Sequence, residues 1–149
     1  MGAQARYIGV MEPDRSVAGQ GPYPITGPLA VLARVAFLGA LAAIVVAVFL
    51  PSSLVPHFVR SHYLQHFAAY YVAALFGLAA SPRARIRTVA LRLLAFATML
   101  EALHLLSGAG LRPLIDNWVA DLGGMAAAFA PLAVARFRRR FERPPQAEA

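Results

Sequence analysis

Four long apolar stretches, separated by short segments rich in proline, glycine or arginine, dominate this sequence. The first runs from about Pro28 to Leu50, the second from about Tyr63 to Ala80, and the third from about Val89 to Leu106. The fourth has Pro113 in its first turn and extends to about residue 135. A helix of about 20 residues crosses a hydrocarbon core of about 30 Å. We therefore predict an all-α polytopic membrane protein, a bundle of four transmembrane helices.

The composition is also that of a membrane protein. Hydrophobic residues make up 59% of the 149 positions and charged residues only 14%, whereas soluble domains carry about 25% charged residues. The absence of cysteine excludes a disulfide framework, a thiolate nucleophile and a thiolate metal site. No phosphate-binding loop or dinucleotide-binding glycine motif is present, and we expect no cofactor.

The fourteen basic residues are all arginines, and their positions predict the orientation of the bundle. Most of them flank the end of the second stretch or follow the fourth: Arg83, Arg85, Arg87, Arg136, Arg138, Arg139, Arg140 and Arg143. The connections on the opposite side contain only Arg60 and Arg112. Because arginine is retained on the cytoplasmic side, we predict a multi-pass protein of the plasma (inner) membrane with both termini in the cytoplasm. Arginines in these places contact lipid headgroups, so we expect membrane lipids as partners and no nucleic acid.

The chain divides into three parts on this interpretation. Residues 1–27 mix glycine, proline and charged residues without an apolar period, which predicts a flexible cytoplasmic tail. Residues 28–136 form the membrane domain, and residues 137–149 form a basic cytoplasmic tail. Within the domain, Pro51 and Pro56 open an external loop, and Gly108 and Gly110 end the third helix.

Polar residues within the apolar stretches fall at one level of the predicted bundle. They lie at the start of the second stretch, the end of the third and the start of the fourth: His62, Gln65, His66, Glu101, His104, Asp116, Asn117 and Asp121. Antiparallel helices bring these positions to the outer part of the membrane. Since polar groups are costly against lipid, we expect them to face one another across the bundle.

The spacing within each helix supports a common face. Residues His62, His66 and Tyr70 are separated by four positions each, Glu101 and His104 by three, and Asn117 and Asp121 by four. Side chains at these separations stack on one side of a helix. Two interpretations stay open: a polar pocket that carries function, or hydrogen bonds that only hold the helices together.

Glu101 and His66 are the best acid–base candidates, because Glu101 is the carboxylate furthest from the predicted surface and His66 is placed to meet it. A structural pair of the same residues is the alternative. The side chains of His66, Glu101, His104 and Asp121 are chemically suited to a divalent metal. Such groups in membrane bundles more often satisfy each other, so we predict no metal, and no established catalytic motif marks an enzyme.

Four motifs occur in order along the chain. They are Leu54-Val55-Pro56 after the first stretch, Gln65-His66-Phe67-Ala68-Ala69-Tyr70 in the second, Glu101-Ala102-Leu103-His104 in the third, and Arg112 followed by Asn117 to Gly124 in the fourth. This order resembles the VanZ-like family of small bacterial membrane proteins over about residues 30–136. The sequence departs from the family pattern at Gln65, His104 and Asn117, where an acid or lysine, a glutamine and an aspartate are usual.

The resemblance implies a cell-envelope protein. The founding member of the family is associated with low-level resistance to teicoplanin, an antibiotic that acts at the outer side of the envelope. A pocket that binds a lipid or glycan headgroup at the outer leaflet is the first hypothesis, with Arg112 as a cation for a phosphate or carboxylate. The second is a non-catalytic accessory subunit that docks on other membrane subunits through its basic tail and the small residues of its fourth helix, Gly123, Gly124 and the alanines between Ala126 and Ala135. The third is a metal-dependent intramembrane enzyme.

Overall fold

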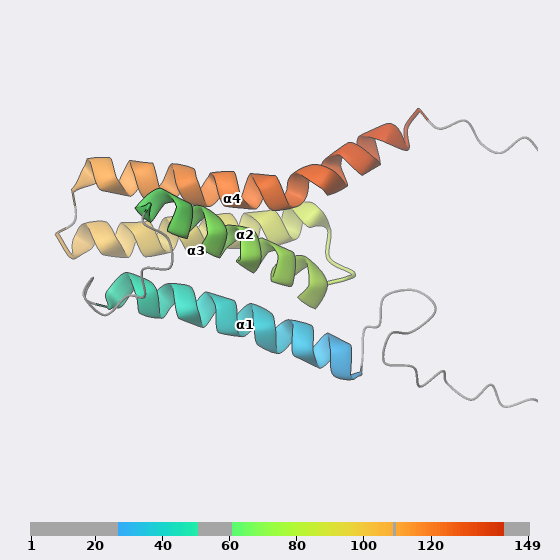
Figure 1. The fold of residues 1–149 in the computed structure, drawn as a ribbon, viewed down its shortest axis with the longest axis horizontal. Coiled ribbons are helices and arrows are strands. Elements are labelled where there is room, and N and C mark those ends of the chain that lie inside the picture. The colour runs from blue at the N-terminus through green and yellow to red at the C-terminus, as the bar shows by residue number, and fades with distance from the viewer. Residues whose placement is uncertain (1–26, 51–60, 109, 142–149) are drawn as a thin grey trace, which may run out of the picture.

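The computed structural model describes residues 27–50, 61–108 and 110–141 (Figure 1). This part of the chain forms four helices: α1 (Pro28–Phe49), α2 (His62–Ala80), α3 (Ile86–Leu106) and α4 (Leu111–Arg138). The prediction of an all-α fold with four helices in these places is confirmed. The predicted external loop, its Leu54-Val55-Pro56 motif, Arg60, Arg143 and nearly all of the N-terminal tail lie outside the described residues.

Three of the four helices, α1, α3 and α4, are long and apolar enough to cross a membrane. The 19-residue helix α2 is not among these candidate spans, and the polar residues His62, Gln65 and His66 lie in its first turns. The chain is thus a multi-pass helical membrane protein by the length and composition of its helices.

The helices alternate in direction (Figure 1). Helices α1 and α3 run one way, and α2 and α4 run the other. One end of the bundle, the polar end, holds the last turns of α1 and α3 and the first turns of α2 and α4. The opposite end, the arginine end, holds the start of α1, the α2–α3 turn and the end of α4.

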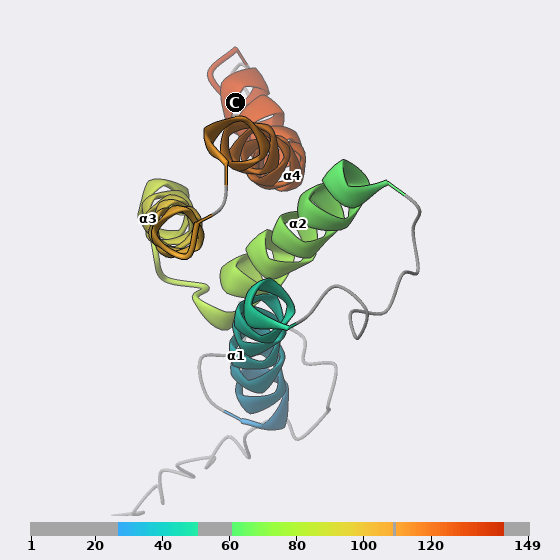
Figure 2. The same ribbon diagram turned by 90° about the vertical axis from the view of Figure 1, so that its left-hand side faces the viewer.

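Helix α2 occupies the centre of the arrangement, as the end-on view in Figure 2 shows. Its most extensive contacts are with α4 and then with α1, whereas its contacts with α3 are few. Helix α3 packs mainly on α4, and α1 and α4 do not touch within the described part of the chain. The short arginine-rich turn makes α2 and α3 antiparallel, as expected, but the principal partner of α2 is the parallel helix α4.

Glycine in α4 explains how closely α2 and α4 approach. A Cβ atom on Gly124 would overlap the carbonyl oxygen of Phe67, and it would lie 3.0 Å from the backbone nitrogen of Tyr71. A Cβ on Gly123 would lie 3.3 Å from the Phe67 ring. Small residues permit such backbone contact where lipid supplies no hydrophobic drive for association.

Both the core and the outer surface of the bundle are apolar. Large side chains of α1, including Val31, Leu32, Val35 and Leu38, are 56–63% exposed. The core consists of smaller or fully enclosed side chains such as Ala73, Ala97 and Leu93. A helix that is apolar on all sides belongs in a bilayer, because a soluble protein rarely exposes so much apolar surface.

Two helices are longer than the sequence predicted. Helix α3 begins at Ile86 rather than Val89, and α4 continues to Arg138 rather than residue 135. Arginines are good helix formers, and their long side chains reach water from a helix end, so the end of an apolar stretch need not end a helix. Helix α4 also contains Pro131, and its C-terminal part turns away from the bundle (Figure 1), as an internal proline favours.

Candidate functional site

The polar side chains of three helices meet at the polar end of the bundle. Helix α2 contributes His62 and His66, α3 contributes Glu101 and His104, and α4 contributes Asn117 and Asp121. Three of them are nearly inaccessible to solvent: Glu101 is 4% exposed, Asn117 is 3% and Asp121 is 1%. The helical spacing noted in the sequence, with neighbours three or four positions apart, places each set on one face of its helix, although His62 in the first turn of α2 is exposed.

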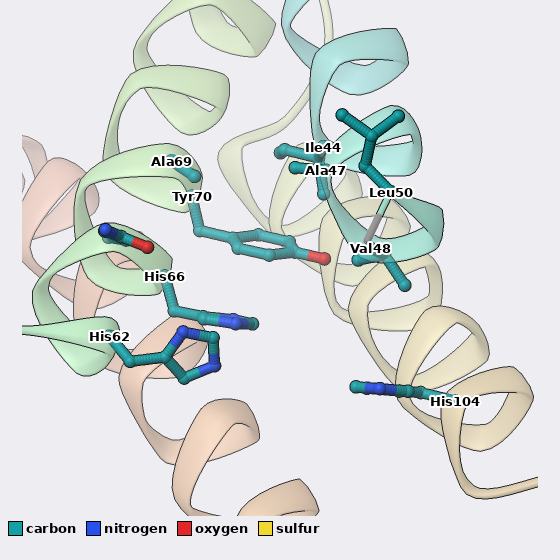
Figure 3. A pocket seen from close by; sticks show the side chains of 10 residues that line it. Ile44, Ala47, Val48, Leu50, His62, His66, Ala69, Tyr70 and His104 are labelled. Atoms are coloured by element: carbon teal, nitrogen blue, oxygen red, sulfur yellow. The ribbon is translucent and has the colours of Figure 1, made fainter. Parts of the chain in front are cut away.

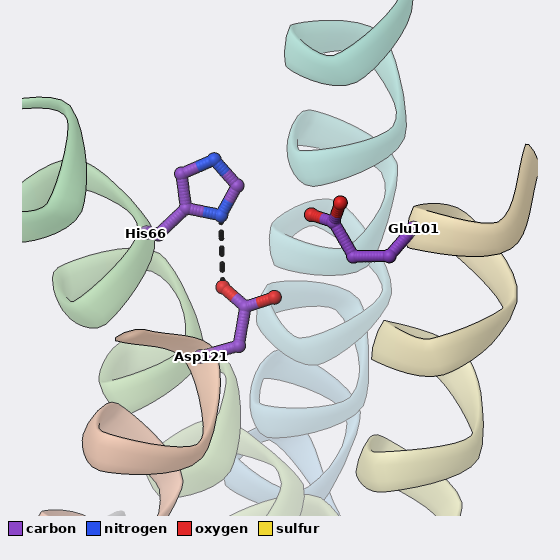
Figure 4. Close-up of side chains that lie close together, drawn as sticks. All are labelled: His66, Glu101 and Asp121. Atoms are coloured by element: carbon purple, nitrogen blue, oxygen red, sulfur yellow. Dashed lines mark hydrogen bonds and ion pairs between the residues drawn. The ribbon is translucent and has the colours of Figure 1, made fainter. Parts of the chain in front are cut away.

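The shortest contact in the cluster joins α2 to α4. The Nδ1 atom of His66 lies 2.9 Å from Oδ1 of Asp121 (Figure 4). With its proton on Nδ1, the ring donates a hydrogen bond to this carboxylate, and the second ring nitrogen stays available to another group. The close packing at Gly124, one turn further along α4, holds the two helices at the separation this contact needs.

Glu101 faces the same space from α3 (Figure 4). Its Oε2 atom is 4.0 Å from Nδ1 of His104, which is too far for a hydrogen bond. Within the described part of the chain, Oε2 of Glu101 and Oδ2 of Asp121 are buried and accept no hydrogen bond. Buried polar atoms in proteins are almost always paired, so two such oxygens in one cluster require an explanation.

Asn117 and His62 complete the cluster. The Asn117 amide interacts with the side chains of both His62 and Glu101. The His62 ring packs edge-on against the ring of His66, with 4.7 Å between ring centroids. These contacts restrict the orientations of Glu101 and His66, the two residues that the sequence singled out for acid–base chemistry.

A cavity of about 360 Å³ lies beside the cluster, between α1, α2 and α3 (Figure 3). One wall consists of aliphatic side chains of α1 and of the residue that follows it: Ile44, Ala47, Val48 and Leu50. The other walls consist of Ala69 and the polar side chains of α2 and α3: His62, Gln65, His66, Tyr70 and His104. The cavity therefore has an apolar side and a side with imidazole, amide and phenol groups.

The remaining predicted site residue, Arg112, does not line this cavity. It is exposed in the first turn of α4, close to Tyr63 and Asp116. Asp116 accepts a hydrogen bond from the Tyr63 hydroxyl at 3.1 Å, so this predicted cluster member lies with Arg112 and not with Asp121. The Arg112 guanidinium is thus not part of the cavity lining, and the nitrogen donors of the lining are the imidazoles of His62, His66 and His104 and the Gln65 amide.

Sequence reasoning did not find the α1 wall of the cavity. Ile44, Ala47 and Val48 are three and four positions apart and therefore share a face, but the same is true of many apolar residues in α1. It also missed the hydrogen bond that the Trp118 indole donates to the Thr98 hydroxyl at 3.1 Å, which links α4 to α3.

This arrangement has three chemical capacities. The His66–Asp121 pair can accept or donate a proton, the carboxylates can coordinate a cation, and the cavity can hold an apolar group next to a polar one. Comparisons with models of protein families, with curated proteins and with solved structures find no match for this chain.

Proposed function

We propose that this chain is a cell-envelope membrane protein that binds the polar headgroup of a lipid, or of a lipid-linked glycan, in the cavity beside α1. In this proposal all four helices cross the membrane, both termini are cytoplasmic, and the polar end of the bundle lies at the outer leaflet. The function rests on one observation, the cavity with an aliphatic wall and an imidazole-bearing wall.

The arrangement of the helices supports this topology. The start of α1 and the end of α4 lie at the same end of the bundle, together with Arg83, Arg85 and Arg87 (Figure 1). Arginines concentrated at one end favour the cytoplasmic side for that end. The polar first turns of α2 are compatible with crossing the membrane, because α2 packs between α1 and α4 and buries Tyr70, Ala73 and Ala74.

The cavity suits an amphiphile in size and chemistry. Small-molecule sites commonly enclose about 300 to 1,000 Å³ and combine apolar walls with a few polar groups. An acyl or prenyl chain would lie against Ile44 and Val48, and an anionic headgroup would receive hydrogen bonds from the imidazoles of His62 and His104. The resemblance to the VanZ-like family, which is itself part of the proposal, supports a role in the envelope.

The hypothesis of an accessory subunit receives less support. Its main motive was the small residues of the fourth helix, but Gly123 and Gly124 pack against Phe67 of α2. These glycines therefore serve an interface within the chain, whereas Ala126, Ala130 and Ala133 of the same stretch are exposed, and no described feature specifies a protein partner for them.

The headgroup proposal can be tested by filling the cavity. We expect Ala47→Trp to place an indole against the cavity and to exclude the ligand, whereas Ala42→Trp puts the same side chain on another face of α1. Each protein would be purified in mild detergent from bacterial membranes, and retained lipids would be identified by native mass spectrometry. Loss of a specific lipid adduct in Ala47→Trp alone is the expected result. An adduct that is absent from the wild type, or unchanged in Ala47→Trp, would contradict the proposal.

A further inference from the structure

His66, Glu101 and Asp121 form a cluster that the headgroup proposal does not use in full. One nitrogen of His66 and one oxygen of each carboxylate all lie within 4.8 Å of one another (Figure 4). The three side chains come from three different helices, so the convergence is a product of the tertiary fold and not of local sequence.

The carboxylates of this cluster are incompletely satisfied. Glu101 and Asp121 are 4% and 1% exposed, and each has one buried oxygen without a hydrogen-bond donor in the described structure. Two ionised carboxylates carry two negative charges, and the neighbouring imidazoles of His66, His62 and His104 can offset them only if they are protonated inside the bundle. Burying such an excess of charge is costly unless a cation or a proton compensates for it.

We propose that His66, Glu101 and Asp121 bind one divalent transition-metal ion, of the Zn²⁺ or Mn²⁺ class. One imidazole and two carboxylates are the donor set that these ions accept. A divalent ion bound by two carboxylates and a neutral imidazole is electrically neutral, which suits a site inside a membrane bundle. Three protein ligands also leave a coordination position open for water or another oxygen ligand.

An ion would need the Glu101 carboxylate to move closer to the other two ligands, since the three ligand atoms lie within 4.8 Å of one another. Ligand atoms at about 2.1 Å from one ion lie about 3 Å apart, and Nδ1 of His66 is already 2.9 Å from Oδ1 of Asp121. Glu101 has three rotatable side-chain bonds, so its carboxylate can approach the pair if its contact with Asn117 rearranges. Asn117 and His62 would orient the ligands from a second layer, as outer residues do in many metal sites.

The metal site does not depend on the proposed headgroup function, although the two are adjacent. His66 belongs both to the cluster and to the cavity lining. If both proposals hold, an oxygen of the bound headgroup can take the open position on the ion. This last step rests on the proposed function.

The test uses the full chain, freed of any histidine tag and of metal, in mild detergent. The protein is incubated with Zn²⁺ or Mn²⁺, desalted and analysed for metal by mass spectrometry. We expect about one ion per chain in the wild type, and at least a tenfold loss in Asp121→Asn and Glu101→Gln. Asp116→Asn makes the same chemical change five residues earlier in α4, outside the cluster, and should retain the ion.

Two further measurements keep the outcome decisive if a variant fails to fold. Saturating metal should raise the unfolding temperature of the wild type by about 5 °C, because an ion that binds only the folded state stabilises it. The Ala47→Trp variant should bind metal like the wild type, so loss of headgroup binding and loss of metal binding are distinguishable. A wild type with no retained ion and no thermal shift would overturn the metal site in favour of a proton shared by the carboxylates. Equal metal binding by Asp121→Asn would also overturn it, because the ion would then bind at another place.

Discussion

Replacing Gly124 by alanine tests the contact that sets the distance between α2 and α4. The added Cβ would overlap the carbonyl oxygen of Phe67 and lie 3.0 Å from both its carbonyl carbon and the Tyr71 nitrogen. These are backbone atoms of a helix, so no side-chain rotation relieves the overlap, and the two helices must separate. Overpacking of this kind costs about 1 to 3 kcal/mol, and we expect a value near the upper limit because the most extensive helix–helix contact is affected.

The matched control is Gly39→Ala in α1. A Cβ at Gly39 would meet nothing within 4 Å, so this variant gains helix propensity without a clash and should be neutral or more stable by up to about 1 kcal/mol. In a chain of this size a loss of about 2 to 3 kcal/mol lowers the unfolding temperature by roughly 4 to 12 °C. Thermal unfolding followed by circular dichroism in detergent measures the difference.

Gly124→Ala should also weaken the His66–Asp121 contact, which lies one turn from Gly124 on the same pair of helices. Metal retention should therefore fall in Gly124→Ala and stay unchanged in Gly39→Ala. If Gly124→Ala unfolds at the wild-type temperature or above, the close approach of α2 and α4 described here is wrong, and the explanation of the cluster geometry fails with it.

Two other predictions concern the packing of α3 and the orientation of the bundle. Thr98→Val removes the acceptor of the Trp118 indole hydrogen bond and should lower the stability by about 1 kcal/mol. Because the chain contains one tryptophan, a shift of its fluorescence emission reports the loss of this hydrogen bond directly. Unchanged emission and unchanged stability would show that the hydrogen bond does not stabilise the fold. The sequence lacks cysteine, so single-cysteine variants give clean topology data. An impermeant maleimide should label Ser107→Cys in intact cells but Arg83→Cys only after permeabilisation, and the reverse pattern would invert the proposed orientation.

The positions of the helices could be predicted because bilayer thickness imposes a length and an apolar composition that are visible in a single sequence. Their ends were less predictable, since the arginines before Val89 and after residue 135 are compatible with helix but resemble loop by hydropathy. The pairing of α2 with α4 was not predicted. The small residues of the fourth helix were predicted to dock on other subunits, and nothing in the sequence specified that Gly123 and Gly124 contact Phe67.

The polar cluster was predictable for a related reason. Polar residues are rare in apolar helices, so their depth and their three- or four-residue spacing restrict where they can lie. Such an argument does not extend to Arg112, whose long side chain can reach water from the end of α4 and need not face the others. Nor does it extend to the α1 wall, because Ile44 and Val48 differ in no visible way from the exposed aliphatic residues around them.

The polar first turns of α2 and its central position are related. Polar residues such as Gln65 and His66 are costly against lipid, and α2 reduces this cost by packing between α1 and α4, where both side chains are partly buried. The glycines of α4 make that packing close enough for His66 to reach Asp121, while the sparse contact between α2 and α3 leaves room for the cavity beside His104. More apolar first turns in α2 would remove His66 from the cluster and His62 and Gln65 from the cavity lining. We therefore expect these polar residues of α2 to carry the function.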